Sequence, residues 1–168
     1  MKAFVFLENQ FQDAEVLYPY FRLQEAGFEV RGVAPEKKTY HGKYGYPFDA
    51  DALAAEVKNE LVDVIVIPGG WAPDRLRRSQ AVLDIAKNHM QQSKIVASIC
   101  HGAWVLVSAN VLKGRTVTCY DAIQDDVKNA GAKYVDQEVC VDGNLVTSRK
   151  PSDLPAFCRE IIRLSRET

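Results

Sequence analysis

Long apolar runs are absent from the sequence, and so is an excess of charge of one sign. No stretch approaches the ~20 consecutive apolar residues that a membrane-spanning helix needs. The formal net charge is -1, so no strong attraction to nucleic acid or to an anionic membrane is expected. Residues 1–10 hold a short apolar stretch that meets Glu8 at once, which predicts a strand rather than a signal peptide and therefore a cytoplasmic protein.

Cysteine and histidine are scarce, with 4 cysteines and 3 histidines among 168 residues. No two cysteines form a C-x-x-C motif, and His41 and His89 are distant in sequence from all of them. We therefore expect no metal site. Without a secretory signal, disulfide bonds are not expected either. A buried, unreactive thiol is the default interpretation of Cys100, Cys119, Cys140 and Cys158.

Apolar strands and amphipathic helices alternate along the chain, and no repeat or linker interrupts them, so residues 1–168 are predicted to form one domain. The alternation predicts a doubly wound, mostly parallel sheet with helices on both faces. We expect strands at 2–7, 28–35, 62–70, 94–100 and 115–120, and helices at 13–27, 51–60, 79–92, 101–112, 122–131 and 152–167. Residues 38–48 are expected to form a hairpin or an ordered loop, and residues 133–148 a small β-hairpin.

Residues 96–106, VASICHGAWVL, place a cysteine and a histidine between two apolar runs. The first run predicts a strand and the second a helix, so SICHG at 98–102 has the form of a nucleophile elbow apart from its first residue. Such a turn lifts one side chain out of the sheet, and the free N–H groups of a helix N-terminus favour an anion there. The elbow therefore favours a Cys100 pKa below the ordinary value of about 8.5, and Gly102 allows close backbone packing.

The order of the histidines excludes two acyl-transfer arrangements. An α/β-hydrolase and a glutamine amidotransferase both need a histidine late in the chain, and no histidine follows His101. The base for Cys100 is then His101, a carboxylate, or one of the two upstream histidines. His89 is expected on the exposed face of its helix and His41 in a loop, so both are interpreted as structural residues.

The PGG segment at 68–70 follows a predicted core strand and has backbone N–H groups free of side-chain obstruction. The amides of Gly70 and His101 are candidates for a two-donor oxyanion hole. A plain strand-to-helix turn is the alternative, and it is the simpler interpretation of this segment taken alone.

Four segments together resemble the PfpI subfamily of the ThiJ/PfpI superfamily: FQDAEVLYPYFRLQEAGFEV at 11–30, PGGWAPDRLR at 68–77, VASICHG at 96–102, and GRTVTCYDAIQDDVKNAGAKYVDQEVCVDGNLVTSR at 114–149. The resemblance extends from the first strand to the last helix. Members are described as intracellular cysteine proteases, general stress proteins, protein deglycases and cofactor-free glyoxalases. It implies a flavodoxin-like or class I glutamine amidotransferase-like fold, no cofactor, and a homodimer or hexamer.

The resemblance also implies roles for individual residues. Cys100 matches the nucleophile and His101 the base. Glu15 matches an acid that contacts the sulfur, and a carboxyl beside a thiolate tends to stay protonated and to donate a hydrogen bond. Asp74 matches an acid, usually glutamate, that reaches the histidine from a neighbouring subunit, although aspartate is shorter. Gly70 and the His101 amide match the oxyanion hole.

Several positions bear on substrate choice. Tyr120 matches a residue near the mouth of the pocket, and a packed aromatic is an equal alternative. Gln12 stands where the family often has a second acid. Ala103 and Trp104 stand where it often has a proline and a polar residue, and Trp104 either narrows the pocket or packs in the core.

The resemblance thus implies a cofactor-independent cysteine hydrolase of PfpI type, a peptidase or protein deglycase that acts on carbonyl or amide substrates in a stress or carbonyl-damage response. The expected substrates are small carbonyl compounds, glycated proteins or peptides. Small substrates are favoured over an extended peptide. Glyoxalase-type conversion of methylglyoxal to a hydroxy acid is an alternative, because the first half of the chemistry is shared. A non-enzymatic redox sensor is another, because an accessible, activated thiol is readily oxidised to the sulfinic acid.

Overall fold

Seven strands form the central sheet in the computed structural model, which describes residues 1–167. Thr168, the last residue of the predicted domain, lies outside the described residues. Across the sheet the order is β10 (Val139–Asp142), β11 (Leu145–Ser148), β7 (Ile95–Ile99), β6 (Val64–Ile67), β1 (Lys2–Phe6), β2 (Glu29–Ala34) and β5 (Ala52–Leu53). All neighbouring pairs are parallel except β10–β11. The predicted mostly parallel α/β sheet is confirmed.

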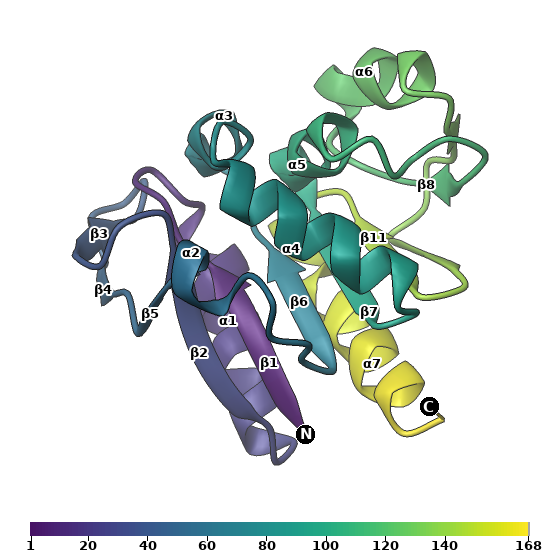
Figure 1. Cartoon of the computed structure of the whole chain (residues 1–168). Helices are drawn as coiled ribbons and strands as arrows, with labels where there is room; N and C mark the ends of the chain where they lie inside the picture. Colours follow the sequence, from purple (N-terminus) through teal and green to yellow (C-terminus); the bar gives the residue numbers. More distant parts are fainter. Residues whose placement is uncertain (168) are drawn as a thin grey trace.

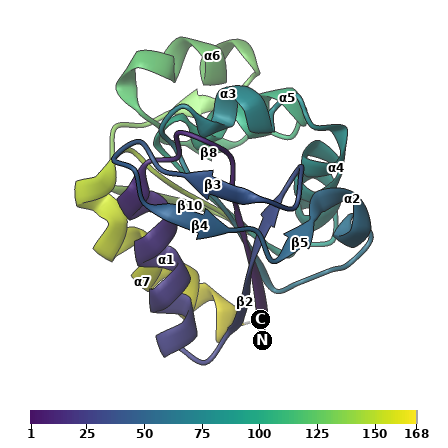
Figure 2. The same cartoon turned by 90° about the vertical axis from the view of Figure 1, so that its left-hand side faces the viewer.

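Helices cover both faces of the sheet (Figures 1 and 2). On one face α1 (Asp13–Glu25) packs beside α7 (Leu154–Ser165). On the other, α4 (Gln80–Gln91) contacts β7, α2 (Ala54–Val57) and α5 (Ala103–Ser108). The short helices α3 (Ala72–Leu76) and α6 (Gln124–Asn129) lie near the end of the sheet where β6 and β7 stop. Within residues 1–167, no helix combines the length and apolar character needed to cross a bilayer.

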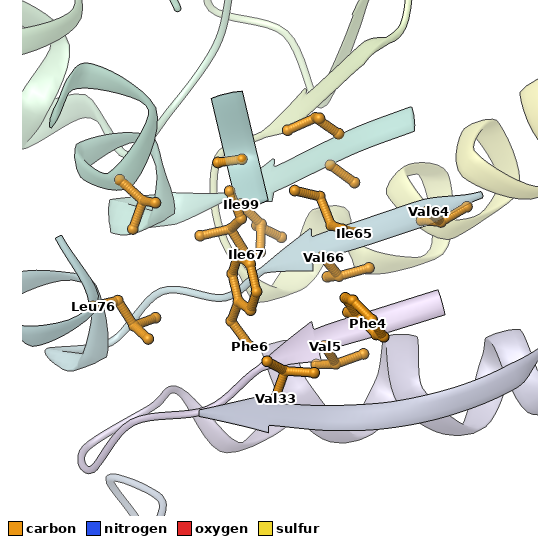
Figure 3. Packing of buried hydrophobic residues seen from close by; sticks show 14 of the residues in the cluster. Phe4, Val5, Phe6, Val33, Val64, Ile65, Val66, Ile67, Leu76 and Ile99 are labelled. Carbon is orange, nitrogen blue, oxygen red and sulfur yellow. The ribbon is translucent and has the colours of Figure 1, made fainter. Parts of the chain in front are cut away.

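The three central strands are apolar on both faces, because helices cover them on both sides. Every residue of β6 and β7 is buried, as are four of the five residues of β1. Figure 3 shows Phe6, Ile67 and Ile99, the last residues of these strands, packed together at one end of the core. This packing fixes the strand ends from which the candidate site is built.

The expected strand at 115–120 is much shorter in the structure. Only Thr116–Val117 is extended, as β8, and it pairs with β9 (Lys133–Tyr134) in a separate parallel pair. The next residues bond elsewhere: the Thr118 amide donates to Thr147 Oγ1 at 2.9 Å, and the Tyr120 amide to the Cys100 carbonyl at 3.3 Å. The chain therefore leaves the ladder to cross the elbow, and the expected hairpin at 133–148 begins only at β10.

The short strand β5 was not expected and lies within the segment 51–60 that was assigned to a helix. The short helix α3 overlaps residues 74–79, whose charges are typical of a solvated helix start. Residues 38–48 do form a hairpin, from β3 (Thr39–His41) and β4 (Pro47–Asp49). Its tip is joined to the loop after β1, since the Gln10 amide donates to the His41 carbonyl at 2.8 Å. That connection brings the hairpin to the carboxyl ends of the strands.

Candidate active site

Cys100 occupies a strained turn directly after β7. Its φ is +60°, in the left-handed region that residues other than glycine rarely adopt. A single 3-10 turn, Cys100–Gly102, links the strand to α5. Strain of this kind persists only where the surroundings enforce it, and it is common at reactive sites. The backbone therefore has the conformation that the elbow motif predicts.

Gly102 permits this turn to lie against the neighbouring strand. A Cβ atom at this position would stand 2.6 Å from the Ile67 carbonyl oxygen and 2.9 Å from Ser98 Oγ. Both contacts are shorter than van der Waals separation, so any larger residue displaces the elbow. The expectation that Gly102 allows close packing is confirmed.

The two predicted oxyanion donors converge on the same atom. The backbone amides of Gly70 and His101 both hydrogen-bond to the Cys100 sulfur, an interaction that favours the thiolate. Gly70 has a φ of +75°, and a Cβ there would lie 2.4 Å from the Gln10 carbonyl oxygen. Only glycine fits this position, so the orientation of its amide is built into the turn after β6.

Glu15, in the first turn of α1, is completely buried behind the sulfur. Its Oε2 accepts a hydrogen bond from the Gly69 amide at 2.7 Å, whereas Oε1 has no hydrogen-bond partner among the described residues. Burial raises the pKa of Glu15 to about 7, against the opposing effects of the Gly69 amide and the Cys100 thiol. Its carboxyl therefore exchanges a proton near neutral pH.

The Cys100 thiol differs from the expectation of a lowered pKa. Burial, followed by the negative charge of Glu15, raises its pKa to about 12, and the two backbone amides oppose this only in part. The elbow motif predicts the donors but not the depth at which the sulfur lies or the charge beside it. Protonation of Glu15 removes the second cause, so the acidities of the two groups are linked.

His101 lies beside Cys100, with Nδ1 at 3.3 Å from the sulfur. Its ring stacks on Tyr120 at 4.9 Å between centroids, meets the edge of Trp104 at 5.1 Å, and lies 6.2 Å from Trp71. Burial, and next the positive charge of Lys43, lower its pKa, so the imidazole is neutral near pH 7. A neutral ring with one free nitrogen can accept or relay a proton.

A cavity of about 430 Å³ opens over the sulfur. Besides Cys100, His101 and Gly70, its walls are formed by Gln12, Lys43, Trp71, Tyr120, Ala122 and Pro151. Gln12 and Tyr120 were expected near the pocket. The sequence reasoning missed the other four, and for Lys43 the one available signal was its place in a glycine-flanked hairpin tip.

Asp74 and Trp104 are candidate site residues whose contacts the sequence did not determine. Asp74 lies on α3 with an exposed carboxylate that pairs with Arg78 at 3.1 Å, and within residues 1–167 it forms no hydrogen bond or ion pair with His101. Trp104 is not among the residues that line the cavity. Its Nε1 donates to Asp126 Oδ2 at 2.9 Å, and its ring supports the His101 ring from the side.

The expectation that His89 lies on an exposed helix face is wrong. The side chain is fully buried, with Nδ1 at 2.8 Å from the Ile85 carbonyl oxygen and Nε2 accepting the Val62 amide at 3.2 Å. Both nitrogens of a neutral ring are satisfied there, which is why the core tolerates it. His41 lies in β3 with an exposed side chain. Neither histidine lines the cavity.

The other three cysteines are buried as free thiols, and burial raises the pKa of each. Cys100 is the one cysteine among the described residues that lines the cavity. Residues 1–167 contain no group of three or more His, Cys, Asp or Glu side chains that could hold a metal ion. The arrangement supports nucleophilic chemistry by a thiol with a carboxyl and an imidazole beside it.

The doubly wound α/β sheet and the cysteine elbow over a buried glutamate together define a class of α/β proteins. The chain was compared with known sequences and structures of that class. The family model described as the DJ-1/PfpI family matches residues 1–164, and the chain belongs to this family. Two relatives, Deglycase PH1704 of Pyrococcus horikoshii and Deglycase PfpI of Pyrococcus furiosus, are each 46% identical over 164 residues, which cover 98% of this chain and 99% of theirs.

A solved structure from Anabaena variabilis has the same fold. It is a two-domain protein containing DJ-1/ThiJ/PfpI-like and ferritin-like domains, with a TM-score of 0.94 and 39% sequence identity. The match covers 97% of this chain and 47% of that one, so this chain spans about half its length.

Proposed function

We propose that this protein is a cofactor-independent cysteine hydrolase that removes carbonyl adducts from amines or thiols, the activity for which its Pyrococcus relatives are named. The observation that carries the proposal is the elbow: a strained Cys100 receives hydrogen bonds from two backbone amides while a buried carboxyl with one unpartnered oxygen lies beside it. A purely structural thiol needs none of these features.

In the first step Cys100 loses its proton without a change in the net charge of the site. Glu15 and the Cys100 thiol together carry two protons at low pH, and the pair loses the first of them near pH 7. One proton then remains, shared between the carboxyl and the sulfur. Transfer of that proton from sulfur to Glu15 gives a thiolate beside a neutral carboxyl. The Gly70 and His101 amides stabilise the thiolate and then the oxyanion that forms on the substrate.

The thiolate next forms a bond to carbon. With a free dicarbonyl such as methylglyoxal, sulfur adds to the aldehyde carbon and the oxygen gains a proton, which gives a hemithioacetal. With a glycated amine the same carbon carries the nitrogen, so the C–S bond forms as the C–N bond breaks, and the amine leaves with the proton that Glu15 took from the thiol. Both routes lead to one intermediate.

Two proton transfers and one water complete the cycle. A proton moves from the sulfur-bearing carbon to the neighbouring carbonyl carbon, and the hydroxyl proton passes to the neighbouring oxygen, by way of an enediolate. This converts the hemithioacetal to a hydroxyacyl thioester on Cys100. Water hydrolyses the thioester, releases the hydroxy acid and restores the thiol. The neutral His101 at 3.3 Å from the sulfur is the base for the carbon-bound proton.

The experiment is lactate release from the methylglyoxal adducts of N-acetyllysine and N-acetylcysteine. We expect turnover by the native protein, loss of turnover in Cys100→Ser, and retention in Cys140→Ser, a matched change at a cysteine outside the cavity. Absence of turnover in the native protein on the adducts and on methylglyoxal would overturn the proposal and favour the redox-sensor alternative.

An excess of aminoguanidine, which traps free methylglyoxal, separates the deglycase from the glyoxalase. An enzyme that acts on the adduct itself continues to release lactate at its initial rate under the trap. If the trap stops lactate release, the protein acts on the free dicarbonyl, and the glyoxalase alternative replaces the deglycase.

For Asp74 we propose a role across an interface between two copies of the chain, in a homodimer or hexamer. The carboxylate on α3 is exposed and, within residues 1–167, forms no hydrogen bond or ion pair with His101 of its own chain, which supports this. Mixed oligomers of Cys100→Ser and Asp74→Asn copies should regain activity, because one site then combines an intact Cys100 with an intact Asp74. No regain in mixtures would contradict the shared site.

A further inference from the structure

The cavity over Cys100 has an uneven distribution of charge. Lys43 is the one residue with a permanent charge among the described residues that line it. Position 12, where an acid would add a negative charge to the cavity, is occupied by the neutral Gln12. His101 is neutral because burial lowers its pKa. A substrate entering this cavity therefore meets a cation and no carboxylate on its walls.

The backbone of Lys43 is held in place by contacts from outside its own hairpin. Its amide donates to the Phe11 carbonyl at 2.8 Å. The Asp13 carboxylate accepts the amides of Tyr44 at 2.9 Å and Tyr46 at 3.2 Å, which clamps the hairpin tip onto the start of α1. Gly42 is required for this clamp, since a Cβ there would lie 2.4 Å from Asp13 Oδ1. The clamp fixes the base of the lysine side chain at the cavity.

The Lys43 ammonium is not neutralised by a partner. It lies 5.8 Å from the centre of the Tyr44 ring and forms no ion pair within residues 1–167. The nearby Asp13 carboxylate is already engaged by two backbone amides. The positive charge nevertheless acts on the reacting groups, because it contributes to lowering the pKa of His101 and of Glu15. An unpaired cation at the wall of a reactive cavity is a ready binding group for an anion.

We propose that Lys43 binds a carboxylate of the substrate, so that the site prefers carbonyl compounds and adducts that carry a negative charge. This assignment deepens the proposed function and rests on it for the identity of the substrate, but the anion preference itself is a property of the cavity. A carboxylate paired with Lys43 holds its carbonyl carbon in the same cavity as the Cys100 sulfur.

The test uses two alkylating probes of nearly equal size, iodoacetate and iodoacetamide, which differ by one negative charge. The quantity measured is the ratio of their rates at Cys100, followed by mass mapping, and it does not depend on turnover. In Lys43→Gln we expect the iodoacetate-to-iodoacetamide ratio to fall roughly fivefold, the size of one partly exposed ion pair. Lys43→Arg should keep the native ratio.

Two further variants sharpen the comparison. Gln12→Glu places a competing carboxylate in the cavity and should lower the ratio as Lys43→Gln does. Lys87→Gln removes the same charge from the exposed side of α4 and should leave the ratio unchanged. An unchanged ratio in Lys43→Gln, or an equal fall in Lys87→Gln, would overturn the proposal.

Turnover provides the second readout. The methylglyoxal adducts of N-acetylcysteine and of its amide differ only by the carboxylate, and kcat/KM should favour the charged adduct in the native protein and lose that preference in Lys43→Gln. If neither adduct is turned over while the alkylation ratio still depends on Lys43, the proposed function fails and the anion subsite stands. Equal kcat/KM for the two adducts in the native protein would contradict the substrate preference.

Discussion

Replacement of Glu15 by glutamine tests how the thiol becomes reactive. Glutamine keeps the size of the side chain and an oxygen for the Gly69 amide, which donates to Oε2 at 2.7 Å. It lacks the ability to take a proton from the sulfur. In the native protein the pair loses its first proton near pH 7, the pKa of Glu15. In Glu15→Gln, only ionisation of the thiol itself can give a thiolate.

The size of the effect follows from these pKa values. Burial is the largest influence on the Cys100 thiol and raises its pKa, so the thiol of Glu15→Gln should ionise above its ordinary value of about 8.5. The midpoint of reactivity then moves up by at least about 1.5 pH units from the native midpoint. The shift of the midpoint is the quantity to measure, because well below both midpoints a thiolate beside a neutral carboxyl and a thiolate beside the glutamine amide are equally populated.

The assay is the rate of alkylation of Cys100 by iodoacetamide between pH 5 and pH 10, with mass mapping of all four cysteines. Glu25→Gln on the same helix is the matched control and should keep the native midpoint. A native midpoint far above pH 7 that Glu15→Gln does not move would refute the reasoning, because the carboxyl would then take no part in ionising the thiol.

Three further predictions concern stability. The folded pKa of Glu15, about 7, lies above its unfolded value of 4.5, so the stability that the protonated carboxyl contributes is lost as pH rises through 7. Glu15→Gln should therefore be more stable than the native protein by on the order of 3 kcal/mol at pH 8, measured by urea unfolding. A stability equal to or lower than that of the native protein would contradict this. Burial lowers the pKa of His89, so the stability of the native protein should fall as pH drops through about 6.5. In thermal unfolding, the Tm of His89→Gln should fall less between pH 7.5 and pH 5 than the Tm of the native protein. An equal fall in both proteins would count against the prediction. Gly102→Ala should lower the free energy of unfolding by about 1–3 kcal/mol and slow the alkylation of Cys100, because its Cβ would lie 2.6 Å from the Ile67 carbonyl oxygen. If the variant kept the stability and the alkylation rate of the native protein, the elbow would relax without loss and the prediction would be wrong.

The parts of the fold that were predictable depend on local patterns. The apolar runs at β1, β6 and β7 and the amphipathic pattern of α4 are visible in the sequence, and so is the strand–Cys–x–Gly–helix order of the elbow. The short strand β8 was overestimated because apolar character at 115–120 also suits a chain that crosses the elbow. Its amides bond to Thr147 and to the Cys100 carbonyl, which only the tertiary structure determines.

The misjudged site features all depend on contacts between distant segments. His89 is buried because its ring bonds both to its own helix and to Val62, 27 residues earlier. Lys43 reaches the cavity because its amide donates to the Phe11 carbonyl and its hairpin tip is clamped by Asp13. Nothing in the sequence marks Val62, Phe11 or Asp13 as a neighbour of these residues. Residue type alone could therefore not place the side chains of His89 and Lys43.

The most direct test of the account is the detection of the covalent intermediate. The native protein is mixed with the methylglyoxal adduct of N-acetyllysine, quenched in acid within the first turnovers, digested and analysed by mass spectrometry. The account predicts a hydroxyacyl thioester on the peptide that contains Cys100, and none on those that contain Cys119, Cys140 or Cys158. Turnover without an adduct on Cys100, or turnover that survives in Cys100→Ser, would contradict it.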